Sequence, residues 1–218
     1  MAPIFAPGAN LVAKLALLVV GGCLVVVFLI GWIVPSTEWA TRVDYPIGQP
    51  VPFSHQHHVG ELGLDCRFCH TTVERSATAG MPPTHTCMTC HSQLWTNAKV
   101  LAPVRASLAS GKPLHWNRVN QLPDYVYFNH SIHIAKGVGC VTCHGRLDQM
   151  PLTSKQASLR MAWCVDCHRD PRPNLRPREA VFDMAWRRSK DTPSGKALFA
   201  RYHIRSAAEL TDCSVCHR

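Results

Sequence analysis

Cys66-Arg-Phe-Cys69-His70 is the stretch that decides the fold of this chain, because its pattern returns four more times. The pattern is two cysteines separated by two residues and followed at once by a histidine. The other copies are Cys87-Met-Thr-Cys90-His91, Cys140-Val-Thr-Cys143-His144, Cys164-Val-Asp-Cys167-His168 and Cys213-Ser-Val-Cys216-His217. The five copies use every one of the 11 cysteines except Cys23.

This spacing indicates covalent attachment of c-type haem. Two thiols three positions apart can form thioethers with the two vinyl groups of one porphyrin, and the next imidazole can then bind the iron. A zinc ribbon does not need a histidine directly after each pair. A thioredoxin-like site needs one pair rather than five, and a disulfide between such close cysteines would be strained. We therefore predict five haem c groups, one for each motif.

A haem that only carries electrons is expected to have a second axial ligand on its iron. Two Phe-x-His-x-x-His units precede the first and third motifs, and histidines three positions apart lie on one face of a helical turn. We expect the first histidine of each unit to bind the next haem in sequence and the second a more distant one. The four candidates are His55, His58, His130 and His133. The fifth distal ligand is left open among His57, Met150, Met161, His203 and His85.

The same units reveal an internal repeat, since His55 and His130 are 75 positions apart and Cys66 and Cys140 are 74 apart. We predict two-haem modules at 53–96 and 128–170, a helical linker at 97–127 and a single-haem segment at 171–218. Helices are expected at Asn97–Lys112, Arg178–Ser189 and Gly195–Tyr202, while strand signals are weak. The predicted fold is mainly irregular chain and short α-helices, with the haems forming the core.

The apolar stretch Leu11–Val34 holds a single charge, Lys14. About 20 apolar residues cross a bilayer as a helix, whereas the apolar region of a signal peptide has about 7–15. Val20-Gly21-Gly22-Cys23 is similar to a lipobox, but the residues after it stay apolar. We predict an uncleaved signal-anchor helix within 1–35, in which Cys23 is a small buried apolar residue. Since haem c is attached outside the cytoplasm, the N-terminus is expected inside and residues 36–218 in the periplasm of a bacterial inner membrane.

The formal net charge of +9 does not indicate a nucleic-acid partner, because the compartment is wrong. Each haem brings two propionates, which are expected to pair with much of the excess of Arg and Lys. The rest is either a solvated face or a docking surface for an acidic partner. It is concentrated at Arg169, Arg172, Arg176, Arg178, Arg187, Arg188 and Lys190.

Taken together, these features resemble the pentahaem cytochrome c subunit of alternative complex III, a quinol:electron-acceptor oxidoreductase. The resemblance covers nearly the whole chain. The Phe-x-His-x-x-His unit is also similar to that of the class III multihaem cytochromes. The residues that carry the resemblance are Phe53-Ser-His-Gln-His-His-Val-Gly-Glu-Leu-Gly-Leu-Asp-Cys66, Phe128-Asn-His-Ser-Ile-His133, Gly145-Arg-Leu-Asp-Gln-Met-Pro151 and Ser158-Leu-Arg-Met-Ala-Trp-Cys-Val-Asp-Cys-His-Arg169.

The resemblance implies an electron-transfer subunit, without catalytic residues of its own, that passes electrons from a membrane quinol-oxidising complex to a periplasmic cytochrome, a copper carrier or a terminal oxidase. Its implied partners are polytopic quinol-binding, iron–sulfur and monohaem cytochrome subunits. An alternative is a membrane-anchored quinol dehydrogenase that feeds a periplasmic reductase. A multihaem enzyme acting on nitrite or hydroxylamine would need a five-coordinate haem, often with an altered motif, whereas all five motifs here keep their histidine.

Overall fold

The computed structural model describes residues 6–217, which divide after Arg42 into two compact units. The first unit contains helix α1 (Ala9–Ile33), the 3-10 helix η1 (Val34–Ser36) and the short helix α2 (Glu38–Thr41). Helix α1 has 25 residues and is therefore about 38 Å long. By length and composition it can cross a membrane. The expected apolar helix is thus present.

Cys23 corrects one expectation about this helix. The residue lies on the exposed surface of α1 rather than inside protein. The reason is that α1 has no buried residue along its whole length. The thiol of Cys23 is therefore not covered by any other described part of the chain.

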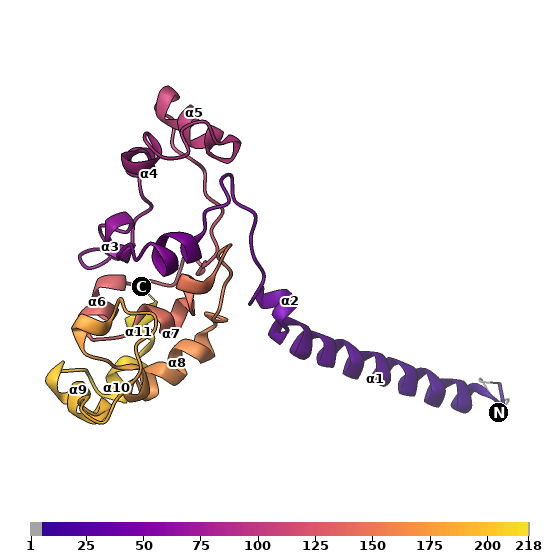
Figure 1. Cartoon of the computed structure of the whole chain (residues 1–218). Coiled ribbons are helices and arrows are strands. Elements are labelled where there is room, and N and C mark those ends of the chain that lie inside the picture. The colour runs from indigo at the N-terminus through magenta and orange to yellow at the C-terminus, as the bar shows by residue number, and fades with distance from the viewer. Residues whose placement is uncertain (1–5, 218) are drawn as a thin grey trace. The chain divides into compact units, whose positions relative to one another are not determined.

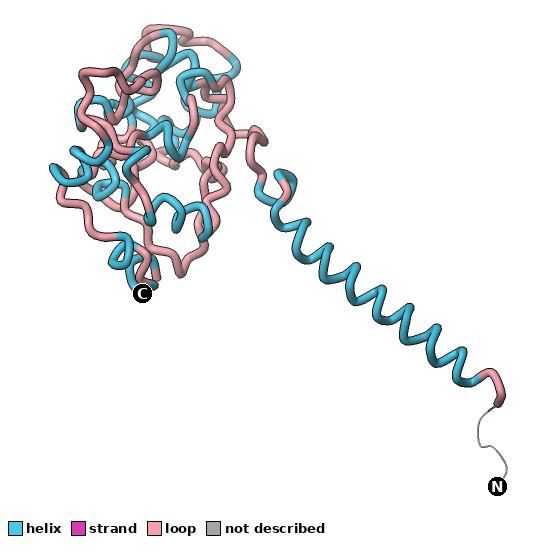
Figure 2. Tube along the Cα trace, turned by 90° about the horizontal axis from the view of Figure 1, so that it is seen from below, coloured by secondary structure: helices cyan, strands magenta, loops and turns pink. Residues whose placement is uncertain are grey.

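The second unit, from Val43 onward, is built from short helices joined by loops, and Figure 2 shows no strand in the described residues. Its helical elements follow in chain order. They are η2 (Gln56–Glu61, a π-helix), α3 (Cys66–Cys69), α4 (Thr84–His91), η3 (Lys99–Leu101), α5 (Ala102–Ser110), α6 (His130–Ala135), α7 (Cys140–His144), η4 (Leu147–Gln149), α8 (Met161–Arg169), η5 (Arg172–Asn174), η6 (Arg178–Ala180), α9 (Gly195–Arg201), α10 (Ala207–Leu210) and α11 (Cys213–Cys216). Isolated bridges such as Val43 with Lys155 replace a sheet. The predicted fold class is confirmed.

Two small clusters make up the packed side-chain core of this unit. One is formed by Val51, Leu101 and Val104, against which Met88 and Trp116 pack. The other is formed by Leu175, Leu198 and Tyr202, with Val138, Phe199 and Ile204 around it. Such small clusters bury too little apolar surface to hold a unit of this size together, so a further apolar core is needed.

The helix expected at Gly195–Tyr202 forms as α9, which ends one residue earlier. The helix expected at Asn97–Lys112 forms only in part, as η3 and then α5, which ends at Ser110. The next residue, Gly111, adopts the left-handed conformation (φ 68°) that favours glycine. The helix expected at Arg178–Ser189 is wrong, since only η6 forms there. Tertiary partners take its carbonyls: Val181 accepts from the Cys140 amide and Asp183 accepts from the Arg176 guanidinium.

Figure 1 shows how the helices of the second unit follow one another in space. Helices α4 and α5 lie at one end, α3, α6 and α7 lie in the middle, and α9 and α10 lie at the other end. Close backbone approaches hold the middle together. A Cβ at Gly60 would overlap the carbonyl of Asp148, so glycine is needed where η2 crosses η4.

Candidate haem-binding site

Each Cys-x-x-Cys pair lies on one short helix, namely α3, α4, α7, α8 or α11. Two residues three apart on a helix share a face, so both thiols of a pair point the same way. Two of these helices, α3 and α11, begin at an aspartate cap: Asp65 accepts from the Arg67 amide and Asp212 from the Ser214 amide. The histidine of each motif then stands at or just after the helix end. This is the local geometry that two-point attachment of a planar group requires.

The five motif histidines share one hydrogen-bonding pattern, in which Nδ1 is always the atom that is held. Four of them donate from Nδ1 to a backbone carbonyl, and His144 is instead paired with the side chain of Asn120 at 3.1 Å. The four carbonyl pairs are His70 with Gly80 (2.7 Å), His91 with Leu94 (3.2 Å), His168 with Leu210 (3.0 Å) and His217 with Tyr125 (3.2 Å). In the four histidines that donate to a carbonyl, Nδ1 carries the proton, so Nε2 is left as the atom that can bind a metal.

The four expected distal histidines follow the same pattern. His55 is paired through Nδ1 with the Thr153 hydroxyl at 2.9 Å, and the other three donate to carbonyls. The carbonyl pairs are His58 with Ser54 (2.9 Å), His130 with Ala77 (2.8 Å) and His133 with Asn129 (2.7 Å). All nine imidazoles therefore present Nε2 in a fixed orientation.

Three of these distal rings face a motif histidine across a gap of similar width. Ring centroids are 6.2 Å apart for His58 and His91, 6.4 Å for His130 and His144, and 6.2 Å for His133 and His168. A metal–imidazole bond is about 2.0–2.1 Å long, so two imidazoles on opposite sides of one metal ion have centroids about 6 Å apart. The observed gaps therefore have the width that one iron between two rings would require.

Burial strongly lowers the pKa values of two of these imidazoles, His55 and His144. Burial, with a contribution from neighbouring His70, lowers the pKa of His55 to about 4. Burial, with a contribution from His130, likewise lowers the pKa of His144 to about 4. Both rings are therefore neutral at physiological pH, which is the state that binds iron. The same proximity places His55 beside His70, the histidine of the first motif.

Phe53 and Phe128 explain how each Phe-x-His-x-x-His unit holds its two rings. Phe53 stacks on His58 at 4.4 Å and meets His55 edge-on at 4.9 Å. Phe128 stacks on His133 at 4.5 Å and meets His130 edge-on at 4.7 Å. The two units thus repeat one three-ring arrangement, in which the phenylalanine restrains both imidazoles.

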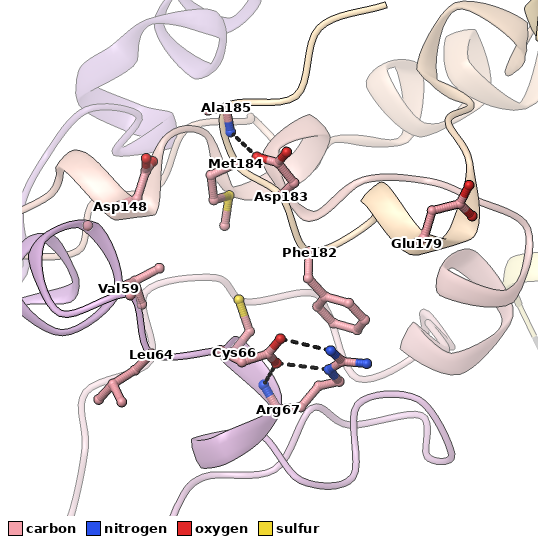
Figure 3. A pocket seen from close by; sticks show the side chains of 13 residues that line it. Val59, Leu64, Cys66, Arg67, Asp148, Glu179, Phe182, Asp183, Met184 and Ala185 are labelled. Atoms are coloured by element: carbon pink, nitrogen blue, oxygen red, sulfur yellow. Dashed lines mark hydrogen bonds and ion pairs between the residues drawn. The ribbon is translucent and has the colours of Figure 1, made fainter. Parts of the chain in front are cut away.

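The surroundings of the motifs fit a large apolar group. Figure 3 shows Cys66 beside a cavity that is lined by the apolar residues Leu64, Phe182 and Met184 and also by charged residues, among them Arg67 and Asp148. Its volume is about 380 Å³. That volume is in the range of ordinary small-molecule sites. Large apolar side chains next to the motifs are also exposed, including Phe68 at 48%, Trp95 at 63% and Met161 at 71%. The cysteines of the motifs are free thiols. These residues fit haem c, which would cover the exposed apolar side chains.

The five candidates for the last distal ligand are spread over the second unit. His57 pairs with Glu61 at 2.8 Å and stacks on Trp95, and Met150 uses its carbonyl to accept from Gln56. Met161 is exposed at the start of α8, His85 is exposed in α4, and His203 is exposed after α9. His217, the histidine of the fifth motif, has the ring of Tyr125 beside it, with the two ring centroids 5.8 Å apart.

Sequence reasoning missed the groups that hold the imidazoles. Thr153 is 98 positions from His55, and Asn120 precedes the motif of His144 by 20 residues or more. Backbone carbonyls leave no signal in the sequence at all.

One member of the basic group that begins at Arg169 and ends at Lys190 needs a correction. Arg176 is buried (6% exposed) rather than on a surface. Its guanidinium lies over Trp186 at 4.8 Å and donates to backbone carbonyls.

Comparison with known proteins agrees with this geometry. Residues 126–218 match the family model described as cytochrome c7 and related cytochrome c. This match covers less than half of the chain. Together with the five repeated motifs, it indicates a membrane-associated multihaem cytochrome c of electron transport, with multiple c-type haems.

A particular relative is the "Menaquinone reductase, multiheme cytochrome c subunit" of Nitratidesulfovibrio vulgaris. It is 37% identical to this chain over 97 residues, which is 44% of this chain and 45% of the relative. The matched region thus spans less than half of the relative's length.

Proposed function

We propose that this chain is the electron-transfer subunit of a membrane complex that exchanges electrons between the quinone pool and a periplasmic redox protein. The observation that carries the proposal is the set of facing imidazoles, each with Nδ1 held and Nε2 free. Bound haem supplies one-electron chemistry, because its iron changes between ferric and ferrous. The chain's own contribution is to hold both ligands of each iron rigidly, so that little rearrangement accompanies the change of charge.

The proposed complement is five haem c groups, one on each motif. In each module, the first histidine of the Phe-x-His-x-x-His unit would serve the first motif and the second would serve the second motif. The proposed ligand pairs are His55 with His70, His58 with His91, His130 with His144 and His133 with His168. His217 would be the protein ligand of the fifth motif, whose second ligand comes from the five candidates above.

The motifs follow one another in space in an order that differs from the sequence. The thiols of Cys69 and Cys87 lie close enough to repel as thiolates, which helps to raise the pKa of Cys69. The same relation links Cys140 with Cys66. Hydrogen bonds agree, since His130 of the second module donates to Ala77 just after the first motif. These contacts place the second motif beside the first and the first beside the third.

Similar contacts support the other end of the series. Burial, with a contribution from neighbouring Cys167, raises the pKa of Cys143 to about 12, and burial, with a contribution from Cys216, raises the pKa of Cys164. His168 donates to Leu210, directly before the fifth motif. The proposed series is therefore second, first, third, fourth and fifth, with the second and fifth motifs at its two ends. A continuous series of close neighbours is the arrangement that electron transfer over a long distance needs.

The identity of the complex is the finer part of the proposal. The first expectation, a subunit of alternative complex III, draws support from the motif runs quoted from the sequence. The relative's printed name is that of a menaquinone reductase, and it favours the second expectation, a membrane-anchored quinol dehydrogenase that feeds a periplasmic reductase, over the first. We therefore propose a complex of the menaquinone-reductase type, in which other subunits bind the quinone.

The proposal also includes the place of the chain. Helix α1 would anchor it in the bacterial cytoplasmic membrane, with the N-terminus inside and residues 36–218 in the periplasm. The periplasmic part would comprise the two modules at 53–96 and 128–170, the linker and the C-terminal segment. The single apolar helix of the described residues offers little room for a quinone pocket. This supports the assignment of quinone binding to polytopic partner subunits.

The test is to purify the complex through a tag on this chain, reduce its haems, and mix it with a water-soluble menaquinone analogue in a stopped-flow spectrometer. We expect the α-band to report reoxidation within milliseconds to seconds for the complex and far more slowly for the isolated chain. A pyridine haemochrome assay on the same sample should give about five haems per chain. Fewer than about four haems, or an isolated chain that reacts as fast as the complex, would contradict the proposal.

A further inference from the structure

Asn120 stands out because it gives His144 a side-chain partner where the other four motif histidines have a backbone carbonyl. Its amide nitrogen lies 3.1 Å from Nδ1 of His144. Its Oδ1 is buried and makes no hydrogen bond within the described residues. A buried acceptor without a partner costs about 1–3 kcal/mol, so this arrangement needs an explanation.

The chemistry of iron ligation explains it. A nitrogen donor facing Nδ1 would require the proton of a neutral His144 to be on Nε2, the atom that must bind the metal. The two ends of an asparagine amide have nearly the same shape, so a half-turn of the amide exchanges oxygen for nitrogen. Oδ1 then accepts from Nδ1–H of His144. One rotation gives the oxygen a partner and frees Nε2 of His144, while the amide nitrogen takes the former place of the oxygen.

We infer that Asn120 is a positioning residue for the third motif, which sets the redox potential there by accepting a hydrogen bond from His144. This inference rests on the proposed function, because it takes His144 as an iron ligand. A hydrogen bond from Nδ1–H to an acceptor makes the imidazole a stronger donor to iron, which stabilises the ferric state. The third motif is central in the proposed series, so its potential governs passage between the two ends.

The place of Asn120 supports a specific role. It belongs to the segment before α6, whose neighbour Asn117 uses its side chain differently, donating to the Gly48 carbonyl at 2.7 Å. Asn120 is half-buried, and its Oδ1 atom beside His144 is fully buried. A water molecule is thus a poor substitute for the amide oxygen. The other four motif histidines donate to backbone carbonyls, which a substitution at position 120 does not remove. The substitution should therefore act at one haem.

The test compares Asn120→Leu and Asn120→Asp in the full-length holoprotein, with Asn117→Leu as the matched control. The readout is a spectroelectrochemical titration of the haem α-band, preceded by a pyridine haemochrome count. Leucine removes the acceptor, so the potential of one haem should rise. Aspartate keeps an acceptor and adds negative charge, so the potential of the same haem should fall. Asn117→Leu should leave the potentials of all the haems unchanged.

The outcomes separate this inference from the proposed function. Suppose that the wild-type protein binds about five haems. The inference alone is then overturned if both Asn120 variants leave all haem potentials unchanged, or if both move a potential in the same direction. If Asn120→Leu fails to fold with its haems, the Asn120→Asp titration still decides, since a fall in one component supports the inference and no change refutes it. A wild-type count below about four haems would refute the proposed function, and the inference with it.

Discussion

His130 and His144 face each other with ring centroids 6.4 Å apart and ring planes only 7° from parallel. His58 and His91 have nearly the same separation, but their planes are 67° apart. When one iron lies between two imidazoles, the angle between their planes controls how the iron d-orbitals split. The ring angles therefore distinguish the haems spectroscopically.

Electron paramagnetic resonance of the ferric protein should resolve two kinds of low-spin signal. We expect a rhombic signal from the parallel pair and a highly axial signal with a large maximum g value from His58 and His91. Substituting His58 by Ala should remove the axial signal and leave the rhombic one. Loss of the rhombic signal in that variant would contradict the ligand assignment.

The second prediction compares a proposed ligand with a histidine outside the candidate set. His58→Ala should leave one haem five-coordinate, with a high-spin ferric signal and about one carbon monoxide bound per reduced chain. His115→Ala removes an exposed histidine that is not a candidate ligand, so it should keep all haems low-spin. Carbon monoxide titration of the two reduced variants measures the difference. Equal binding by both variants would rule out the assignment of His58.

The third prediction concerns a glycine that brings two segments together. Gly137 has φ +76°, and a Cβ there would lie 2.5 Å from the Arg176 carbonyl oxygen and 2.6 Å from the Tyr202 ring. Gly137→Ala should lower the free energy of unfolding by about 2–5 kcal/mol through strain and overpacking. Gly111 has a similar φ of +68° with nothing within 4 Å, so Gly111→Ala isolates the strain, at about 1–2 kcal/mol. Calorimetry of the two holoprotein variants tests this, and equal melting temperatures would show that the contact is unimportant.

The fourth prediction concerns the basic end of the series. Residues 160–205 hold 11 of the 23 Lys and Arg residues but only 5 of the 14 Asp and Glu residues. A double variant, Arg187→Glu with Lys190→Glu, should slow reduction by an acidic flavodoxin about 3–10-fold at low salt, with the difference shrinking at high salt. Lys112→Glu, beyond α5 at the other end, is the control and should have little effect. If the control slows the reaction as much, the docking surface does not lie at the basic end.

The fifth prediction concerns the anchor. A chain that starts at Val43 behind a cleavable signal peptide should fold in the periplasm and bind as many haems as the full chain. Expressed without other subunits, it should appear in the soluble fraction, while the full chain stays with the membrane. Fractionation with haem staining measures both. A truncated chain that still sediments with membranes would show that α1 is not its anchor.

Much of the architecture could be predicted because it depends on local covalent spacing. The five motifs define their own short helices, and Gly111 and Ser194 mark the ends of α5 and α9 through backbone conformation and capping. Helix α1 follows from composition alone. In each of these cases the cause lies within a few residues of its effect.

The rest depends on contacts between distant residues. The Arg178–Ser189 segment has helical composition, yet Arg176 and Cys140 take the carbonyls that a helix would use. The π-helix at Gln56–Glu61 forms where Gly60 crosses Asp148. The partners of His55 and His144 come from remote loops. No spacing rule in the sequence reports these choices.

His130 and His133 stand on one turn of α6, three residues apart, although their rings face different motifs. Three residues of helix advance by about 4.5 Å along the axis. With the proposed ligands, that turn sets the spacing of two neighbouring haems, because both histidines belong to one helix. The spacing therefore does not depend on the length of the loops between the motifs.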